Sequence, residues 1–325
     1  MHSSSKNKSI IKGSDVKVVR PAENTLMIDF CDVQLNDTLL KDAHVGVASR
    51  AVFVHNGFNR NPWNHQVQFK DHIVARDTFS KGSGYTAMYH FVIDGHINYK
   101  QFRAVIEQGN LWNQIMINGK PVKPVAGKWW LDRSFAVLQI GEYLNPGENT
   151  LSLAIDPMSV YAEIEPVYIL GDFNLASADK GWKIISPQPL QLGSWKDQGL
   201  PLYGSGIRYT KKFDLKNADH QFEIHLDQWK GTVAAIKVNG VLAGIIYSEP
   251  NTLNISRHVK KGINEIEVEV IGSLKNLLGP HHNSPQPGMV GPGHWSNIKS
   301  YPPGKDYDTY DYGLMTDFEL FMYDN

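Results

Sequence analysis

Two glutamates near the middle of the chain have the spacing that paired acid chemistry requires. Glu163 and Glu165 stand in the run AEIEP. Side chains two residues apart on a strand point to the same face, so both carboxyls would lie side by side if this run is extended. Hydrolysis of a glycosidic bond uses two carboxyls, about 5 Å apart for retention or about 6.5–9.5 Å apart for inversion. Because residues 265–269 show the same acidic alternation, a solvated strand face is the alternative interpretation.

A second group of candidates lies in the Pro- and Gly-rich loop 276–313. The residues that we expect to bind a ligand there are His281, His282, His294, Trp295 and Tyr301. Aromatic rings complement the apolar face of a sugar, and imidazoles can hydrogen-bond its hydroxyl groups. His281 is also a candidate catalytic residue. Adjacent histidines on an extended chain point opposite ways, so we expect no converging metal site here.

Composition excludes several classes of function. The chain has 325 residues, 42% apolar and 20% charged, with a net charge of −1. No basic field is present to attract nucleic acid or an acidic membrane, and no motif for a phosphate group or cofactor is recognisable. The lone Cys31 can form no internal disulfide and reads as a core thiol. Residues 1–13 lack a signal-peptide core, so we expect a cytoplasmic protein or a fragment of a secreted or periplasmic bacterial one.

An internal repeat organises the elements that would position these residues. The run 209–272 contains predicted strands separated by turns at Asn239-Gly240 and at 262–264, and the same order of strands and turns starts at Tyr89. Asn118 and Asn239 are 121 residues apart, and each precedes a glycine. An Asn-Gly pair between two apolar runs is a strong hairpin signal, because both central turn residues need positive φ. A repeat of this size predicts two like domains.

The predicted fold class is all-β, with two tandem jelly-roll β-sandwiches. Short strands broken by Gly, Pro and Asn are typical of a sandwich or barrel. The expected boundaries are a flexible tail over 1–22, a first sandwich over 23–165 and a second over 166–325. Within the first, we expect one or two strands over 44–56 and at most a short helix over 71–79. Trp129-Trp130 offers one outward ring whichever way its strand faces.

The run KVNGVLAGIIYSEPNTLNISRHVKKGINEIEVEV resembles the sugar-binding jelly roll of glycoside hydrolase family 2 enzymes. The match covers residues 205–272, and 85–155 more weakly. The wider order of motifs resembles the non-catalytic C-terminal region of large bacterial glycosidases, including α-L-rhamnosidase-like ones. The resemblance implies a galactose-binding-domain-like fold, an oligo- or polysaccharide ligand and a glycosidase catalytic domain as partner. Nothing before residue 24 could form the catalytic barrel that precedes this region in such enzymes.

Three hypotheses follow. In the first, the chain is a non-catalytic carbohydrate-binding or accessory region of a glycoside hydrolase system. In the second, it is a small glycoside hydrolase or polysaccharide lyase with its site in the loops between the sandwiches. In the third, it is a structural interaction module without a sugar site. Binding predicts retention on a polysaccharide column without new reducing ends, lost in Trp295→Ala. Catalysis predicts turnover, abolished by Glu165→Gln or His281→Ala. A glycan panel assayed for both retention and product separates the three, because the third hypothesis predicts neither.

Overall fold

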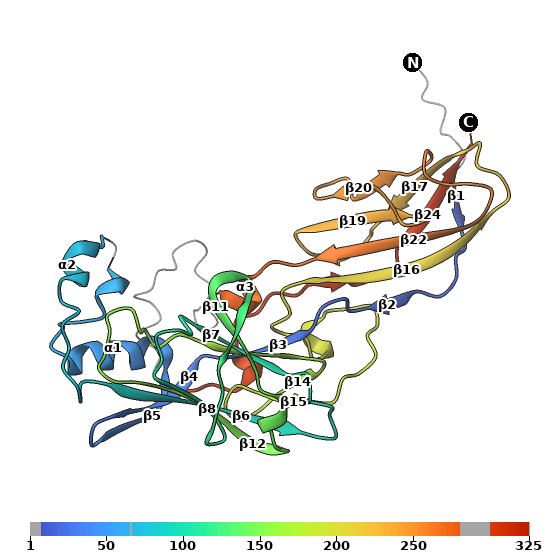
Figure 1. Cartoon of the computed structure of the whole chain (residues 1–325). Coiled ribbons are helices and arrows are strands. Elements are labelled where there is room, and N and C mark those ends of the chain that lie inside the picture. The colour runs from blue at the N-terminus through green and yellow to red at the C-terminus, as the bar shows by residue number, and fades with distance from the viewer. Residues whose placement is uncertain (1–7, 66, 280–299, 325) are drawn as a thin grey trace. The chain divides into compact units, whose positions relative to one another are not determined.

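The computed structural model describes residues 8–65, 67–279 and 300–324. Within them the chain forms two compact units, each built mainly from antiparallel strands (Figure 1). Unit 1 comprises residues 1–23, 188–279 and 309–325, and unit 2 comprises residues 24–187 and 280–308. The all-β fold class expected from the sequence is confirmed.

Unit 1 is a sandwich of two main sheets around one apolar core. The first sheet has the order β1 (Lys8–Ile11), β24 (Glu319–Tyr323), β17 (Gln221–His225), β21 (Thr252–Asn254). The second has the order β2 (Lys17–Val19), β16 (Gly206–Leu215), β22 (Gly262–Ile271), β19 (Val233–Val238), β20 (Val241–Ile246). Smaller elements are η3 (Lys196–Gln198), α3 (Lys275–Leu278) and the pair β18 (Trp229–Lys230) with β23 (Gly313–Leu314). Tyr209, Phe222 and Leu320, from both sheets, meet in the core.

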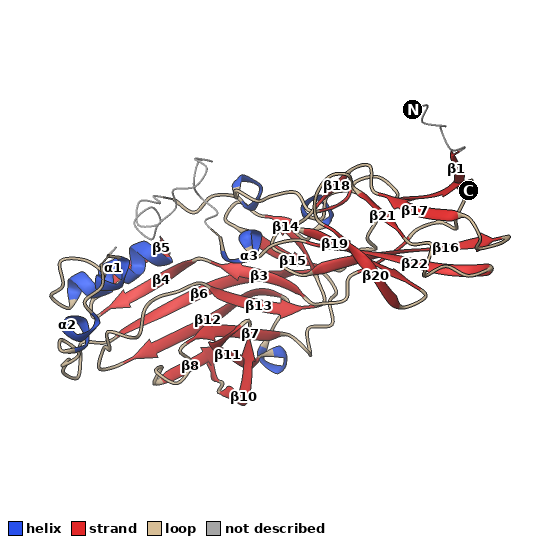
Figure 2. Ribbon diagram, turned by 90° about the horizontal axis from the view of Figure 1, so that it is seen from above, coloured by secondary structure: helices blue, strands red, loops and turns tan. Residues whose placement is uncertain are grey.

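Unit 2 repeats this plan with additions. One sheet has the order β10 (Pro124–Trp130), β11 (Asp132–Gln139), β7 (Arg103–Glu107), β13 (Val167–Gly171), β3 (Asn24–Ile28), and Figure 2 shows the last three side by side. The other has the order β14 (Asn174–Ser177), β15 (Trp182–Ile185), β6 (Tyr85–Asp94), β12 (Gly147–Ile155), β8 (Gln114–Ile117), β9 (Lys120–Pro121), and the hairpin of β4 (Phe30–Leu35) and β5 (Thr38–His44) joins it at β6. Helical elements are α1 (Val45–His55), η1 (Pro62–Asn64), α2 (Lys70–Val74), η2 (Gly141–Tyr143) and η4 (Gly304–Asp306).

The two units share one strand order. β4, β6, β12, β8 and β9 of unit 2 follow each other as β2, β16, β22, β19 and β20 do in unit 1. In the opposite sheets, β3, β13, β7 and β11 follow each other as β1, β24, β17 and β21 do. Every one of these neighbouring pairs is antiparallel.

The course of the chain differs from the expected tandem arrangement. β1 and β2, inside the supposed tail 1–22, pair with β24 and β16 of unit 1, as the blue strands in Figure 1 show. Unit 2 therefore interrupts unit 1 after its second strand, and the boundary at 165/166 is replaced by one near residue 187. The sequence of residues 8–19 contains no pattern that predicts these two short strands, because they form only by pairing with residues about 200–300 positions away.

A buried asparagine holds the central turn in each unit. In unit 2, Asn118 has a φ of 49° and donates to Oδ1 of Asn149, 2.8 Å away. In unit 1, Asn239 has a φ of 52° and donates to Oδ1 of Asn264 over 3.0 Å. Asn149 and Asn264 each also bond three backbone groups of the loop before their own strand. The positive φ values confirm the predicted Asn-Gly turns, and the amides clamp each turn to the neighbouring strand.

One predicted element is wrong. Most of the range 44–56 forms helix α1 (Val45–His55) instead of strands. The valines there favoured a strand, but the buried residues Val45, Ala48, Ser49, Val52 and Phe53 recur with the helical spacing. Burial of that face against unit 2 outweighs the local preference. The short helix expected over 71–79 is present as α2, which starts one residue earlier and ends sooner.

Replacement of either clamp residue should destabilise its own unit. Asn149→Ala or Asn264→Ala removes four hydrogen bonds of a buried side chain, three of them to backbone groups, so we expect a loss of about 2–4 kcal/mol. Urea unfolding followed by circular dichroism measures it. The control is Asn217→Ala, an exposed position, where the change should stay within about 0.5 kcal/mol. Equal midpoints for clamp and control variants would contradict the role of the clamp.

Candidate functional site

One row of side chains crosses four strands on the outer face of unit 2. The cross-strand register places Gln34 of β4 beside Thr86 of β6, Thr86 beside Ala154 of β12, and Ala154 beside Gln114 of β8. The alternate residues of β6, starting at Tyr85, are buried in the core. The row therefore faces outward, and it presents two amides, one hydroxyl and one methyl group.

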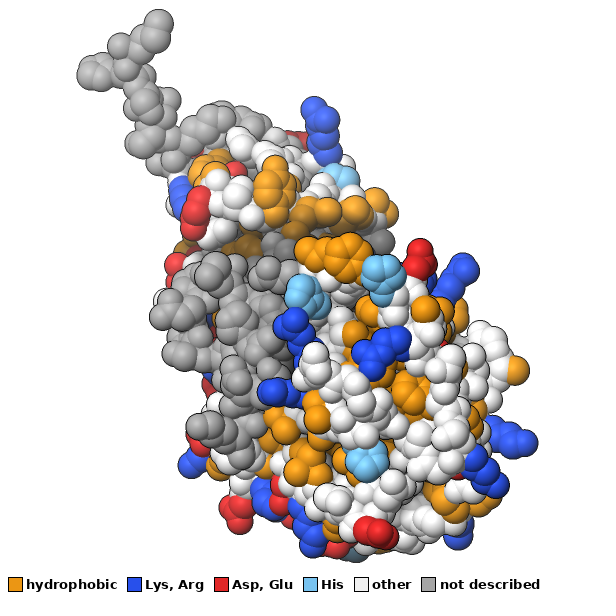
Figure 3. All heavy atoms as spheres, turned by 90° about the vertical axis from the view of Figure 1, so that its left-hand side faces the viewer, with side chains coloured by type: hydrophobic (Ala, Val, Ile, Leu, Met, Phe, Trp, Pro, Cys, Tyr) orange, Lys and Arg blue, Asp and Glu red, His pale blue; other side chains and the backbone are white. Residues whose placement is uncertain are grey.

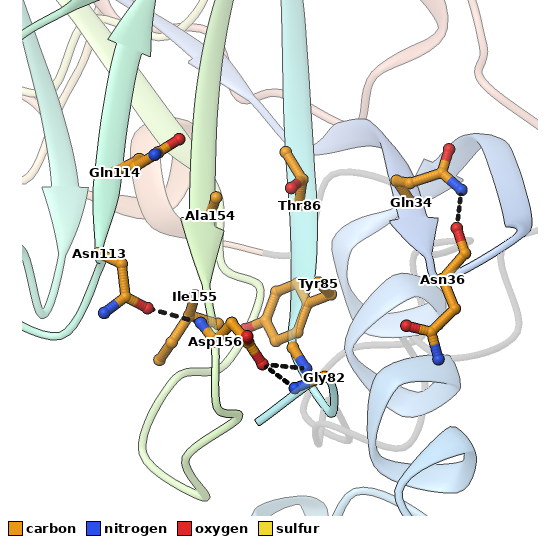
Figure 4. Close-up of a pocket in the computed structure, with 11 residues that line it drawn as sticks. Gln34, Asn36, Gly82, Tyr85, Thr86, Asn113, Gln114, Ala154, Ile155 and Asp156 are labelled. Atoms are coloured by element: carbon orange, nitrogen blue, oxygen red, sulfur yellow. Dashed lines mark hydrogen bonds between the residues drawn. The ribbon is translucent and has the colours of Figure 1, made fainter. Parts of the chain in front are cut away.

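This row forms the floor of a hollow with a volume of about 510 Å³. Figure 4 shows Gln114, Ala154, Thr86 and Gln34 across adjacent strands, with Asn113, Asp156 and Asn36 around them. The small side chain of Ala154 leaves the space that a longer residue would fill. The volume falls within the range of roughly 300–1,000 Å³ that is usual for small-molecule sites.

The rim of the hollow is held in place by hydrogen bonds. Oδ1 of Asp156 accepts from the backbone N–H groups of Gly82 and Gly84, at 2.6 and 3.2 Å. Oδ1 of Asn113 accepts from the backbone N–H of Asp156. These bonds fix the loop before β6 against the end of β12. The carboxyl of Asp156 is the one ionisable side chain besides the buried Tyr85 that lines the hollow.

Polar groups on the floor remain available to a ligand. Within the described part of the chain, the side chains of Thr86 and Gln114 make no hydrogen bond to other protein groups. Gln34 is held by the backbone oxygens of Asn36 and Thr38. The hollow thus combines positioned amides with unoccupied donors and acceptors, which suits a neutral ligand rich in hydroxyl groups.

The corresponding row in unit 1 has a different character. With Asn149 aligned on Asn264, the row there consists of Val19 of β2, Arg208 of β16, Glu269 of β22 and Ala235 of β19. Nε of Arg208 is 3.3 Å from Oε1 of Glu269. Nζ of Lys237 is 2.9 Å from Oε1 of Glu267, and this ion pair raises the pKa of Lys237. Charged side chains that neutralise each other therefore lie on this face of unit 1, where unit 2 has its amide-lined hollow.

Tyr301 is the one predicted loop residue within the described range. Its ring stacks on Phe30 with centroids 4.0 Å apart, and burial raises the pKa of its hydroxyl. It lines a smaller pocket of about 220 Å³ with Trp182 and His90. The structure thus places Tyr301 in a pocket of unit 2. The other four, His281, His282, His294 and Trp295, lie outside the described residues.

Glu163 and Glu165 belong to an acidic group in unit 2 together with Glu107. Burial raises the pKa of Glu163 to about 7, partly offset by a 2.6 Å hydrogen bond from the amide of Asn61. Burial, and then the charge of Glu163, raises the pKa of Glu165 to about 8. Both pKa values lie at or above neutrality, which is the range where a carboxylic acid can donate a proton at pH 7.

Aromatic side chains adjoin this acidic group. The ring of Tyr168 lies 5.2 Å from that of Trp130 and 5.9 Å from that of Phe135. Burial, and then the charges of Glu165 and Glu107, raises the pKa of Tyr168. Trp129 is 55% exposed, so the prediction of one outward ring is confirmed. The acids predicted from sequence and the Trp129-Trp130 pair therefore belong to the same unit.

Two further side chains, Asp311 and Cys31, show how an ion pair and burial shift a pKa in opposite directions. Asp311 pairs with Lys196 and Lys230, and these bonds lower its pKa to about 2. Cys31 is buried, which raises its pKa, as expected of a core thiol.

In the described ranges no three His, Cys, Asp or Glu side chains converge as metal ligands would, and none of the helices there is long and apolar enough to cross a membrane. Figure 3 shows a face where charged side chains of both signs are interspersed with apolar ones.

Sequence reasoning missed the residues of the hollow. Thr86, Ala154 and Gln114 are ordinary strand residues, and only the register brings them together. The repeat did contain one signal. The outward positions of IRYTKKFDL in unit 1 carry Arg208 and Lys212, whereas those of YTAMYHFVID in unit 2 carry no lysine or arginine.

Comparison with known proteins gives partial likenesses. No family model and no curated protein matches the chain. Similar solved structures include a rhamnosidase from Novosphingobium sp. PP1Y (18% identity, 75% of this chain, 22% of that chain, TM-score 0.30). Another is a β-D-glucuronidase from Dictyoglomus thermophilum (11% identity, 78% of this chain, 43% of that chain, TM-score 0.29). A third is a glycosyl hydrolase family 2 member from Bacteroides cellulosilyticus DSM 14838 (10% identity, 77% of this chain, 32% of that chain, TM-score 0.27). The chain spans less than half the length of each. TM-scores of this size leave the function to be argued from the chain's own residues.

The two partly buried glutamates, Glu163 and Glu165, should make stability depend on pH. Their pKa values are raised from the ordinary 4.5, so the folded chain binds more protons than the unfolded one between about pH 4.5 and pH 8. The contribution of these two groups to the free energy of unfolding is therefore fully present below about pH 4.5 and is lost as the pH rises to about 8. Glu165→Gln mimics the protonated acid and removes this loss.

The stability of the variant relative to the wild type should rise by more than about 1 kcal/mol between pH 5 and pH 8, since one unit of pKa shift corresponds to about 1.4 kcal/mol. Urea unfolding at both pH values measures the difference. Glu148→Gln, at an exposed position, is the control and should show no such trend. A constant difference between Glu165→Gln and the wild type would exclude a raised pKa at Glu165.

Proposed function

We propose that unit 2 binds a neutral carbohydrate in the hollow floored by Gln34, Thr86, Ala154 and Gln114. The chain would then act as a non-catalytic, carbohydrate-binding or accessory region of a glycoside hydrolase system. The observation that carries this proposal is the uncharged polar row across four strands. The sequence resemblance to sugar-binding jelly rolls supports the choice of ligand class.

The chemistry of the row matches that of a sugar. A sugar hydroxyl both donates and accepts hydrogen bonds, and the amide of Gln114 and the hydroxyl of Thr86 can each do both. The strands hold these groups on a rigid floor, which reduces the entropy lost on binding. Lysine and arginine are absent from the lining residues, so an anionic ligand would find no counter-charge there.

We further propose that the two units are copies of one ancestral sandwich, with the outer face of unit 2 adapted to a ligand. The shared strand order and the matching clamps of Asn149 and Asn264 support this. The ion pairs of Lys237 in unit 1 occupy the face on which unit 2 has its hollow. Sugar binding should therefore be a property of unit 2.

Removal of single polar groups from the floor should weaken binding. Thr86→Val keeps the shape and deletes the hydroxyl, and Gln114→Ala deletes the amide. A lost hydrogen bond of about 1 kcal/mol corresponds to about a fivefold weaker affinity for each variant. Ala154→Leu fills the hollow and should abolish binding. Isothermal titration with neutral disaccharides (gluco-, manno-, xylo- and galacto-configured) measures the affinities.

Unit 1 and the opposite sheet supply matched controls. Thr210→Val alters an outward threonine of β16, Gln139→Ala an exposed glutamine of β11, and Ala235→Leu a half-buried alanine of β19. These three variants should bind as the wild type does. Unchanged affinity in Ala154→Leu, or an equal loss in its control, would rule out the hollow as the binding site.

A second candidate function rests on the acidic group. Raised pKa values at Glu163 and Glu165 are what the general acid of a glycoside hydrolase requires. If this group is catalytic, incubation with polysaccharides should release reducing ends, and Glu165→Gln should abolish the release. Retention without product would instead favour the binding function.

A further inference from the structure

The smaller pocket opens on the same strands as the hollow. Its lining includes Asp32 of β4, His90 and Val92 of β6, and Glu148 of β12. On β6, Thr86, His90 and Val92 are all outward residues, because the positions between them are buried in the core. On β12, Ala154 belongs to the hollow and Glu148 to the smaller pocket. Both cavities therefore face the same side of unit 2.

The distance between the cavities follows from strand geometry. Antiparallel strands rise about 3.4 Å per residue, so the four residues from Thr86 to His90 span ~14 Å. The outward residues between the two ends are Met88, Ser152 and Thr150, all partly exposed. The register places Met88 beside both Asp32 and Ser152. A continuous and partly exposed track thus joins the hollow to the smaller pocket.

The smaller pocket has the composition of a sugar subsite. It contains the rings of Tyr301 and Trp182, and the indole N–H of Trp182 is buried without a hydrogen-bond partner among the described residues. Both lysines of the pocket are paired with carboxylates: Lys180 lies 2.5 Å from Asp42, and Lys183 lies 2.6 Å from Asp94. Glu148 adds a carboxylate to the lining. Aromatic rings beside paired lysines and a carboxylate favour a neutral polyhydroxylated ligand over an anion.

His90 connects this pocket to the track. Its Nδ1 lies 3.1 Å from the hydroxyl of Thr150, and its Nε2 lies 3.3 Å from Oδ2 of Asp32. The imidazole is exposed and fixed at both nitrogens by its neighbours. It is therefore held at the entrance of the pocket at small cost in side-chain entropy.

We infer that the smaller pocket is a second subsite, and that the ligand is an extended neutral oligosaccharide that lies along β6 and β12 from the hollow to Tyr301. This inference rests on the proposed function and adds the ligand's class: a chain of several sugar units. Binding at two linked subsites strengthens affinity beyond that of either site, provided that the chain is long enough to span both.

The test is a titration of neutral gluco-, manno-, xylo- and galacto-oligosaccharides of two to six units. For the matching sugar, affinity should rise at least tenfold from the disaccharide to the hexasaccharide. His90→Ala should remove most of this gain and leave disaccharide binding unchanged. Trp182→Phe, which keeps a ring and deletes the N–H, should have the same effect. His96→Ala, an exposed histidine outside both cavities, is the control and should bind as the wild type does.

The outcomes separate the two proposals. If the disaccharide binds but longer chains bind no tighter, or if both His90→Ala and Trp182→Phe keep the full gain, the second subsite is refuted and the hollow stands. If oligosaccharides of every length fail to bind, the proposed function and this inference both fall. Circular dichroism of each variant confirms that a lost gain comes from a folded protein.

Discussion

The buried amide of an asparagine sets the register on which each unit depends. Asn149 and Asn264 bind the Asn-Gly turn of the neighbouring hairpin and the loop before their own strand. A slip of one residue in a strand would exchange its buried and exposed faces. The clamp therefore keeps Tyr89 in the core, and with it Thr86 and His90 on the outer face. The ligand-binding proposals follow from this register, because the row across four strands exists only in it.

The same frame carries two different surfaces. In both units the inward residues are constrained by close packing, whereas outward residues on the sheet can change with little effect on stability. Unit 1 has ion pairs at its outward positions, such as those of Lys237 and Arg208. Unit 2 has amides, hydroxyls and small residues around Ala154. Two similar sandwiches can acquire separate roles through such differences in their outward residues.

The nested course of the chain brings distant residues together. Unit 1 closes only when β1 meets β24, near the end of the sequence, and β2 meets β16, which follows the whole of residues 24–187. In unit 2, the hydroxyl of Tyr307 donates to Asp29, 2.8 Å away, and Tyr301 stacks on Phe30. The smaller pocket is therefore completed by residues more than 250 positions apart. Such contacts have a large entropic cost of loop closure, which the burial of aromatic surface helps to offset.

The sequence alone determined the all-β class, the two Asn-Gly turns, one outward ring in the pair Trp129-Trp130 and the buried Cys31, because these depend on local turn chemistry, strand periodicity and burial preference. It also pointed to Glu163 and Glu165, although not to their raised pKa values, which come from burial. Only the tertiary structure decided the nesting of the units, the helix at Val45–His55 and the row from Gln34 to Gln114. The reason is physical: strand register, edge pairing and desolvation are set by partners far away in the chain, and no short stretch of residues contains that information.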